Sequence, residues 1–477
     1  MHLENEVISV NAWMALPFCV LLAAIALGPL FFADWWGRNY PKVVAVLAVI
    51  VVTYYLATLH APWHVLRTAH EYISFITLIG ALFVVSGGIH INVKGEATPG
   101  INVLFLLFGA LLANVFGTTG ASMLLIRPWL RMNKYRVSAH HVAFFIFIVS
   151  NVGGCLTPVG DPPLFLGYLM GVPFWWVMAR GFHIWMVGVG ILLGLFFAVD
   201  YRNYLKAPRS VRAEQTGHSE EWRFDGVENL FFLAIILGAV FVNHPPFLRE
   251  VLMLGAALGS YFTTKKPVHE SNHFSLGPVK EVAILFVGIF ATMMPALEWM
   301  QGNAAKFSEA TAGSFYFGSG ALSSVLDNAP TYLCFLNAAF GRYIPSDIVP
   351  QVMHLVQSHG AGLASLTGPH AAEVRRTFTA LQQFHSAGMT AGSITSDEVQ
   401  VAFLMGNLNL NTYLLAISFG SVFFGANTYI GNGPNFMVKA IADHQKVHTP
   451  SFLGYIGRYT LPFMIPMVLA VWWLYFR

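Results

Sequence analysis

The sequence predicts an all-α integral membrane protein made of two inverted repeats, each with about five transmembrane helices, one re-entrant hairpin and one broken helix. Three observations lead to this prediction: a low charge content, apolar runs of membrane-crossing length in both halves, and a helix-breaking motif that occurs twice. Charged residues are 10% of the 477 residues, against about 25% in soluble proteins. With 56% hydrophobic residues, too few polar groups remain to cover a soluble globule.

The composition excludes several other classes of protein. Disordered chains have low hydrophobicity, and disulfide scaffolds contain far more than the three cysteines present here. A net charge of +3 carries no nucleic-acid signature. We expect no cleaved leader, because the N-terminus is acidic and the apolar run after it is longer than the core of a signal peptide.

Twelve apolar runs near the 20-residue crossing length divide the chain into two sets of six. In the first membrane repeat, residues 1–200, they are about Ala12–Phe32, Pro41–Leu59, Ile73–Ile91, Ile101–Phe116, Val142–Met170 and Gly181–Val199. In the second membrane repeat, residues 227–477, they are about Leu230–Val242, Val251–Phe262, Val282–Leu297, Phe315–Phe340, Ala402–Ala440 and Phe452–Phe476. Residues 201–226 carry five basic residues, which predicts a cytoplasmic linker.

The charges predict that the fourth run of each half enters the membrane and returns. Lys94 precedes this run in the first half and a basic cluster follows it, so both flanks are expected on the cytoplasmic side. Ile101–Arg127 then forms a re-entrant hairpin with the small residues Gly117–Gly120 at its tip. Five crossings remain, and an odd number inverts the second repeat. Its hairpin, Phe315–Phe340 with Asp327–Pro330 at the tip, should enter from the opposite face, with both chain termini outside.

A short motif breaks the helix of the fifth run in each half. Thr157–Pro163 (TPVGDPP) and Thr428–Pro434 (TYIGNGP) share Thr, a β-branched apolar residue, Gly, Asp or Asn, and Pro at the same offsets. Proline and glycine cost helical hydrogen bonds and backbone order. Broken helices in inverted-repeat transporters expose helix ends and carbonyls that bind ions or anionic groups. We favour such a site over two proline kinks that serve packing alone, because both breaks combine Asn, Thr and Gly.

One segment interrupts the symmetry of the two halves. Residues 341–400 form a polar insertion with four histidines and no long apolar run. The histidine spacing matches no recognised metal motif. We therefore expect a surface helical excursion in preference to a metal-binding or pH-sensing segment.

Two carboxylates lie in otherwise uncharged apolar surroundings, Asp161 in the first break and Asp327 at the second hairpin tip. A carboxylate inside the membrane is costly unless it faces a partner, water or a transported ion. Burial disfavours the charged form and an incoming cation favours it, so one acid can exchange a proton for Na⁺. For Asp327 we favour ion or proton binding. For Asp161 the alternative of an Asx turn or helix cap before two prolines has about equal weight.

Neutral oxygen ligands near these acids suit Na⁺ better than a transition metal. The hairpins and the breaks offer Thr118, Thr119, Ser122, Ser324, Asn328, Asn151, Thr157, Asn427, Thr428 and Asn432. Hydroxyl groups in membrane helices often bond back to the backbone, so none of them is decisive alone. Glu281 and Glu298 lie at predicted span ends and are expected at the interface, and Arg127 is expected to snorkel to the cytoplasmic surface.

Enzyme motifs are absent from the sequence: there is no P-loop, no Rossmann glycine pattern after a strand and no HExxH. Transport driven by an ion gradient is the remaining interpretation. It needs no cofactor beyond the transported Na⁺ and H⁺.

Four segments resemble the signature segments of the ion transporter superfamily, which includes NhaD-type sodium/proton antiporters, arsenite-pump membrane subunits and citrate or dicarboxylate transporters. They are Gly117–Pro128 (GTTGASMLLIRP), Ser150–Pro163 (SNVGGCLTPVGDPP), Ser323–Thr331 (SSVLDNAPT) and Gly425–Asn435 (GANTYIGNGPN). The resemblance covers essentially the whole membrane part. It implies a multi-pass protein of the inner (cytoplasmic) membrane, often a homodimer, in which hairpin tips and broken helices enclose the site and move like an elevator.

The resemblance leaves the transported species open. The TTGAS hairpin and the Asp327–Asn328 pair are most similar to the antiporter branch, whereas TPVGDPP is equally similar to the arsenite and citrate branches. Dicarboxylate members usually carry Ser-Asn-Thr in both tips, and Asp327 would repel a carboxylate substrate. We therefore expect Na⁺(Li⁺)/H⁺ exchange. The alternatives are cation-coupled citrate or dicarboxylate transport, arsenite efflux, and a receptor or assembly subunit that binds without flux.

Overall fold

A computed structural model describes residues 10–92, 98–206, 223–242, 245–272, 274–303 and 310–477. The first half contains, in order, η1 (Ala12–Ala15), α1 (Leu16–Phe31), α2 (Ala33–Thr53), η2 (Tyr54–Thr58), α3 (Pro62–Gly87), β1 (His90–Asn92), α4 (Pro99–Met132), α5 (Ala139–Ile148), η3 (Val152–Gly154), α6 (Pro162–Leu169) and α7 (Trp176–Lys206).

The second half begins with β2 (Arg223–Asp225), α9 (Asn229–Ala239), α10 (Leu248–Thr263), α11 (Lys266–Ser271), α12 (Gly277–Asn303), α13 (Ala312–Ser323) and α14 (Asn328–Tyr343). It continues with α15 (Ile348–Gln357), α16 (Ala371–Phe384), α17 (Ser386–Ala391), α18 (Ser396–Gly406), α19 (Leu410–Gly425), α20 (Gly433–His444), α21 (Phe452–Tyr455), η5 (Ile456–Met464) and α22 (Ile465–Tyr475).

The helices confirm the predicted all-α membrane class. Seven helices among the described residues are long and apolar enough to cross a membrane, or eight if α18 and α19, bent by 108°, count as one span. Large apolar side chains on the outer helices face outward, for example Val49 (62% exposed) and Phe262 (77% exposed). Such exposure is unfavourable in water and is expected against lipid.

Helix α4 is the first predicted hairpin. Asn102 and Asn133, near its two ends, exchange side-chain hydrogen bonds of 2.9 and 3.0 Å, although a straight helix would separate them by about 46 Å. The rings of Phe105 and Trp129 also stack, with centroids 5.5 Å apart. The turn is at Gly117, whose φ of 74° and ψ of 155° are not helical. A Cβ there would lie 3.1 Å from the Val159 carbonyl, so both the conformation and the close approach favour glycine.

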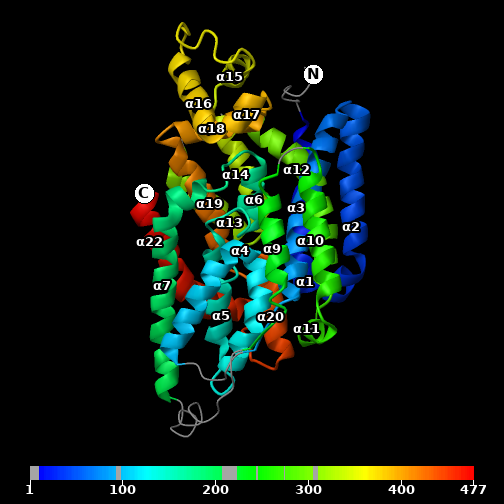
Figure 1. The fold of residues 1–477 in the computed structure, drawn as a ribbon, viewed down its shortest axis with the longest axis vertical. Helices are drawn as coiled ribbons and strands as arrows, with labels where there is room; N and C mark the ends of the chain where they lie inside the picture. Colours follow the sequence, from blue (N-terminus) through cyan, green and yellow to red (C-terminus); the bar gives the residue numbers. More distant parts are fainter. Residues whose placement is uncertain (1–9, 93–97, 207–222, 243–244, 273, 304–309) are drawn as a thin grey trace.

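Helices α13 and α14 form the second predicted hairpin. The hydroxyl group of Tyr343 donates to the Ala310 carbonyl at 2.6 Å, which joins the open ends of the two arms. The tip lies one turn earlier than predicted, because α14 already begins at Asn328. The open end of α14 lies with the α15–α18 helices, whereas the open end of α4 lies at the opposite end of the molecule (Figure 1). The inverted relation between the two complete halves remains a prediction.

Both predicted helix breaks are confirmed. Residues 149–161 separate α5 from α6, apart from the short η3 turn, and residues 426–432 separate α19 from α20. In each break two glycines meet: a Cβ on Gly160 would lie 2.1 Å from the Gly154 carbonyl, and one on Gly431 would lie 2.5 Å from the Gly425 carbonyl. The repeated motif therefore folds into the same compact turn twice.

The helices do not begin and end at the predicted segment boundaries. The last residue of α7 is Lys206 rather than residue 200, because the apolar helix continues into the polar stretch. Residues 207–222 of the expected linker lie outside the described residues, and 223–225 form β2, which pairs antiparallel with β1. The insertion at 341–400 is helical, as expected, but α14 extends into it to Tyr343 and α18 begins at Ser396. Its helices α15–α18 cover one end of the molecule (Figure 1).

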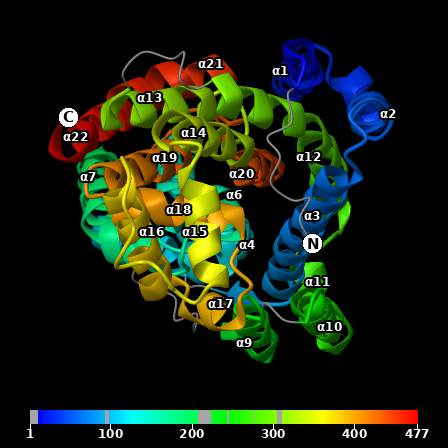
Figure 2. The same cartoon turned by 90° about the horizontal axis from the view of Figure 1, so that it is seen from above.

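The helices form two groups when the molecule is seen from above (Figure 2). Helices α1–α3 and α10–α12 lie along one side, and α4, α6, α14, α19 and α20 lie together on the other. Helix α3 packs against α10 and α12 within the first group and against α4 of the second. Both hairpins and both broken helices thus belong to one group, and α3 lies at its boundary.

Candidate functional site

Asp161 lies where both hairpins and both broken helices meet. It is 1% exposed and precedes the first residue of α6. Its Oδ1 accepts hydrogen bonds from Thr118 Oγ1 at 2.6 Å and Asn432 Nδ2 at 3.1 Å, and its Oδ2 accepts one from Asn328 Nδ2 at 2.5 Å. Thr118 follows the tip of hairpin α4, Asn328 is the first residue of α14, and Asn432 precedes α20. One carboxylate therefore joins four segments that are far apart in sequence.

The electrostatics around Asp161 are unusual for a buried acid. Four helix segments begin beside it, and the positive ends of their dipoles favour a negative charge. Among the described residues, no Lys, Arg or His forms a hydrogen bond or ion pair with its carboxylate, and the charge of Asp327 repels it. The charge is stabilised by neutral donors alone. No resident positive side chain among the described residues therefore occupies the space beside this carboxylate.

The two repeated motifs dock on the two hairpins through the same contacts. Thr157 Oγ1 donates to the Asn114 carbonyl of the first hairpin at 2.6 Å and accepts from the Gly160 amide at 3.1 Å. Thr428 Oγ1 donates to the Ser324 carbonyl of the second hairpin at 2.7 Å and accepts from the Gly431 amide at 3.1 Å. Both threonines are therefore bound to backbone in positioning roles, and neither donates to Asp161.

The side-chain amide of Asn151 is also hydrogen-bonded to other parts of the protein. Its Nδ2 donates to Asn435 Oδ1 at 2.7 Å and to the Ile146 carbonyl at 2.9 Å, and its Oδ1 accepts from Asn432 at 3.2 Å. Asn435 in turn donates to the Gly425 and Thr428 carbonyls. This network fastens the two breaks to each other behind Asp161. Sequence reasoning missed Asn435, although it lies in the GNGPN motif.

The two acids differ in their contacts, and the predicted ion-binding role of Asp327 remains a prediction. Asp327 is half-buried and its Oδ1 accepts from the Ala329 amide at 3.0 Å, so it acts as the N-cap of α14. Asp161, for which a capping role was weighed, makes no such cap bond and instead binds side chains from other elements. Asp327 is first of all a capping residue whose charge acts on the site.

The remaining predicted residues lie around this centre in two places. Ser122 is bonded to Ser150 at 2.7 Å, one turn beyond Thr118. Thr119 makes no side-chain hydrogen bond with the described residues and lines a cavity of about 30 Å³ beside Asp161, which has room for about one water molecule. At the second tip, Asn427 Nδ2 donates to Ser324 Oγ at 2.8 Å.

Two buried amide oxygens near hairpin α13–α14 have no hydrogen-bond donor in the part of the chain that the structure describes. They are Asn328 Oδ1 and Asn427 Oδ1. A buried acceptor without a donor is costly and uncommon. Asn328 also binds Asp161 through its other amide atom, so its free oxygen belongs to the same centre. Amide and carboxylate oxygens are suitable ligands for a hard cation such as Na⁺.

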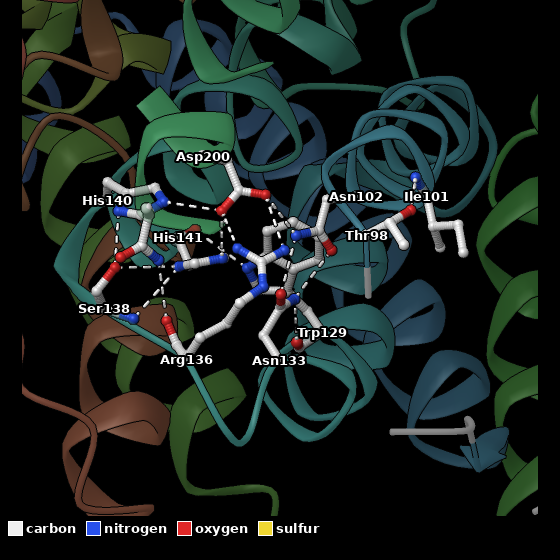
Figure 3. A network of polar contacts seen from close by, with 11 residues as sticks. Thr98, Ile101, Asn102, Trp129, Asn133, Arg136, Ser138, His140, His141 and Asp200 are labelled. Carbon is white, nitrogen blue, oxygen red and sulfur yellow. Dashed lines mark hydrogen bonds and ion pairs between the residues drawn. The ribbon is translucent and has the colours of Figure 1, made fainter. Parts of the chain in front are cut away.

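A second buried polar network lies at the open end of hairpin α4 (Figure 3). Asp200, fully buried near the end of α7, is bound by both guanidinium nitrogens of Arg136, and Nε2 of His140 and of His141 lie 3.2 Å from its Oδ1. Asn102 donates to its Oδ2 at 2.9 Å. Sequence reasoning missed this network, whose only signal is one acid at the end of an apolar run. It fixes both ends of the hairpin to α5 and α7.

The side chains of His140, His141 and Asp200 are spaced closely enough to hold a metal ion. Their hydrogen bonds argue against it. Arg136 already neutralises Asp200, and Nδ1 of His141 faces the Ser138 amide at 3.3 Å, which leaves the ring proton on the nitrogen that faces Asp200. A metal ligand needs that nitrogen unprotonated. The network is therefore better described as a structural clamp.

Comparison with known proteins agrees with the membrane architecture. Residues 7–476 match a family described as putative citrate transport. No curated protein matches the chain. Because the match extends over nearly the whole sequence, both hairpins, both breaks and the insertion all lie within it. The chain, a multi-pass membrane transporter by this evidence, therefore belongs to the putative citrate transport family within the ion transporter superfamily.

Proposed function

We propose that this protein is a cation-coupled secondary transporter in which Asp161 carries the transported Na⁺ or H⁺, and that it exchanges Na⁺ or Li⁺ for H⁺. One observation supports this most strongly: a buried carboxylate, bound only by neutral donors, joins both hairpins and both breaks. Ionised Asp161 offers a cation a negative charge and nearby amide oxygens. Protonated Asp161 is neutral, so the site can be occupied by either ion but not readily by both.

Coupling follows from the position of Asp161. Thr118, Asn328 and Asn432 come from three different segments, and each donates to the same carboxylate. When a cation or proton binds, the charge that these donors stabilise is cancelled, which changes how tightly the four segments are held together. Movement of the whole group past α3 and its neighbours, as in an elevator, would then depend on occupancy of the site. An inner-membrane location and a homodimer remain expectations of this proposal.

Citrate or dicarboxylate transport coupled to a cation is the second candidate, favoured by the family description. The centre itself argues against a carboxylate substrate, because its donors already point at Asp161 and because the charge of Asp327 also acts on this centre. A citrate transporter would need a positive group elsewhere for the anion.

The experiment uses purified protein in liposomes that enclose a pH-sensitive dye. Addition of NaCl or LiCl should move protons out of acid-loaded vesicles, and choline chloride should not. Labelled citrate is followed in parallel vesicles with an imposed Na⁺ or H⁺ gradient. Citrate accumulation without proton movement by Na⁺ or Li⁺ would show that the second candidate is correct. If the folded protein moves neither protons nor citrate, the remaining interpretation is a subunit that binds its ligand without transport.

A further inference from the structure

A larger cavity, of about 280 Å³, lies between the two groups of helices at the boundary formed by α3. Four elements contribute to its walls: α3, the second arm of hairpin α4, the segment before and at the start of α12, and α20. Its lining is mostly apolar, with Phe83, Met123, Phe274 and Phe436 among the large side chains. A volume just below 300 Å³ with a few polar groups is suitable for a small ligand.

Arg127 is the positive group of this cavity. It is half-buried, and it makes no hydrogen bond or ion pair with the described residues. The sequence predicts that its side chain snorkels to the surface, whereas the structure places it in the cavity wall. A half-buried guanidinium without a protein partner is less well stabilised than one that is fully hydrated or paired. An anion in the cavity would supply the missing partner, and the planar guanidinium binds a carboxylate through two parallel hydrogen bonds.

Glu281 is the only acid among the described residues that line the cavity. It is exposed, near the N-terminal end of α12, and it forms no ion pair with Arg127. Its charge is therefore screened by solvent more than that of the half-buried arginine. Both charged residues line the same cavity. Removing the positive charge should therefore weaken the binding of an anion, and removing the negative charge should strengthen it.

The cavity adjoins the centre around Asp161. Phe83 lines both this cavity and the small cavity at the hairpin tip. Thr119, Gly120, Met123 and Arg127 follow one another at helical spacing on the second arm of the hairpin, so a single face of that arm passes from one cavity to the other. A ligand beside Arg127 would thus lie against the same hairpin that holds Asp161.

We infer that the cavity beside Arg127 binds a small di- or tricarboxylate anion, separately from the cation at Asp161. The inference goes beyond sodium/proton exchange, and it supplies the positive group that the second candidate function needs. Arg127 provides the charge-assisted hydrogen bonds, the mostly apolar walls lower the local polarity around them, and the volume limits the ligand to about the size of citrate. Binding alone is inferred, whichever ion the protein transports.

The test measures citrate binding to the full-length protein in detergent by calorimetry, with NaCl at the same ionic strength as the blank. Citrate should bind to the wild type. Arg127→Gln should weaken binding about tenfold or more, the loss expected when one charge-assisted interaction is removed. Glu281→Gln should strengthen it, and Lys134→Gln, which removes an exposed positive charge from the same hairpin region, should leave it unchanged. Absence of binding, or equal affinity in wild type and Arg127→Gln, would overturn the inference.

A second measurement tests the inference if Arg127→Gln folds poorly or if citrate binds too weakly for calorimetry. The natural cysteines Cys19, Cys155 and Cys334 are first replaced, and a cysteine is then placed at Met437 in the cavity wall. The rates at which it reacts with a negatively charged (sulfonate) and a positively charged (ammonium) methanethiosulfonate are compared. Relative to a cysteine at exposed Phe262, the anionic reagent should be favoured at position 437, and Arg127→Gln should remove the preference. An unchanged reagent ratio would contradict an anion-selective cavity.

Two further comparisons separate this inference from the proposed exchange and from lipid. Asp161→Asn should lose exchange and keep citrate binding, so the two claims fail independently. The binding assay is repeated in nanodiscs of phosphatidylcholine and of phosphatidylglycerol. Equal citrate affinity in both lipids is expected. Binding that disappears in the anionic lipid would assign Arg127 to a lipid headgroup and overturn the small-anion site.

Discussion

Asp161 and Asp200 are both buried carboxylates, yet their surroundings differ completely. Asp200 receives a guanidinium, two imidazoles and an amide, so its charge is cancelled within the protein. Asp161 receives one hydroxyl group and two amides, all neutral. Both centres lie on hairpin α4, Asp200 at its open end and Asp161 at its tip. Both acids are buried, so burial does not distinguish them; the difference on which our proposal rests is that, among the described residues, Asp161 has no positively charged partner.

The two centres also differ in what they hold together. Around Asp200, the ends of one hairpin are fixed to α5 and α7 by an ion pair with Arg136 and by amide hydrogen bonds, while Nε2 of His141 lies 3.2 Å from the carboxylate without a hydrogen bond among the described residues. Around Asp161, four helix beginnings meet, and the amide oxygens of Asn328 and Asn427 lack donors among the described residues. A network whose charges are paired gives stability, whereas one with an unpaired charge can respond to an ion. The four predictions below test this division of roles.

The largest expected effect is on transport by Asp161→Asn. Asparagine keeps the shape of the side chain but can neither release a proton nor attract a cation with a full charge. Na⁺-driven proton movement in liposomes should fall to the level of empty vesicles. The matched control is Asp443→Asn, at an exposed acid paired with Lys439, which should retain exchange. Exchange by a folded Asp161→Asn protein would remove the central carboxylate from the mechanism.

The next largest effect is on stability, at the other centre. Asp200→Ala removes the carboxylate that pairs with the buried Arg136, which should lower the free energy of unfolding by about 3–5 kcal/mol. Thermal unfolding in detergent gives the measurement. The double variant Arg136→Met, Asp200→Leu removes both charges and should be more stable than the single variant. If Asp200→Ala unfolds like the wild type and instead alters ion affinity, the clamp interpretation is wrong.

Much of the fold could be predicted because its signals are local. The tip glycine of hairpin α4, the prolines of the two breaks and the repeated TPVGDPP and TYIGNGP motifs each act on their own neighbours in sequence. The centre was only partly predictable. That Asp161 meets Thr118, Asn328 and Asn432 depends on packing over 43, 167 and 271 residues of separation, which no spacing rule records. The Asp200 network has the same origin.

A smaller effect is expected from Thr118→Val, which removes one donor to Asp161 at almost constant volume. The ionised form loses a charge-assisted hydrogen bond while the protonated form loses less. Exchange should continue, with its half-maximal pH moved upward by about one unit. The control is Ser122→Ala, one turn further along, whose hydroxyl group bonds to Ser150 and not to Asp161. An identical pH profile in Thr118→Val and wild type would show that this contact is not coupled to proton release.

The smallest effect is expected at Asp327, the acid that the sequence alone ranked first. Asparagine caps a helix about as well as aspartate, so Asp327→Asn should keep stability and exchange within about threefold of wild type, whereas Asp327→Ala should lose about 1 kcal/mol of stability. Unfolding and flux measured on the same preparations give the comparison. Loss of exchange in a stable Asp327→Asn protein would place the ion site at the second hairpin tip. Asparagine keeps the helix cap, so the loss would have to come from the missing negative charge. Asp161 would then be the supporting acid, held ionised by its neutral donors, and the contrast with Asp200 would concern two structural carboxylates.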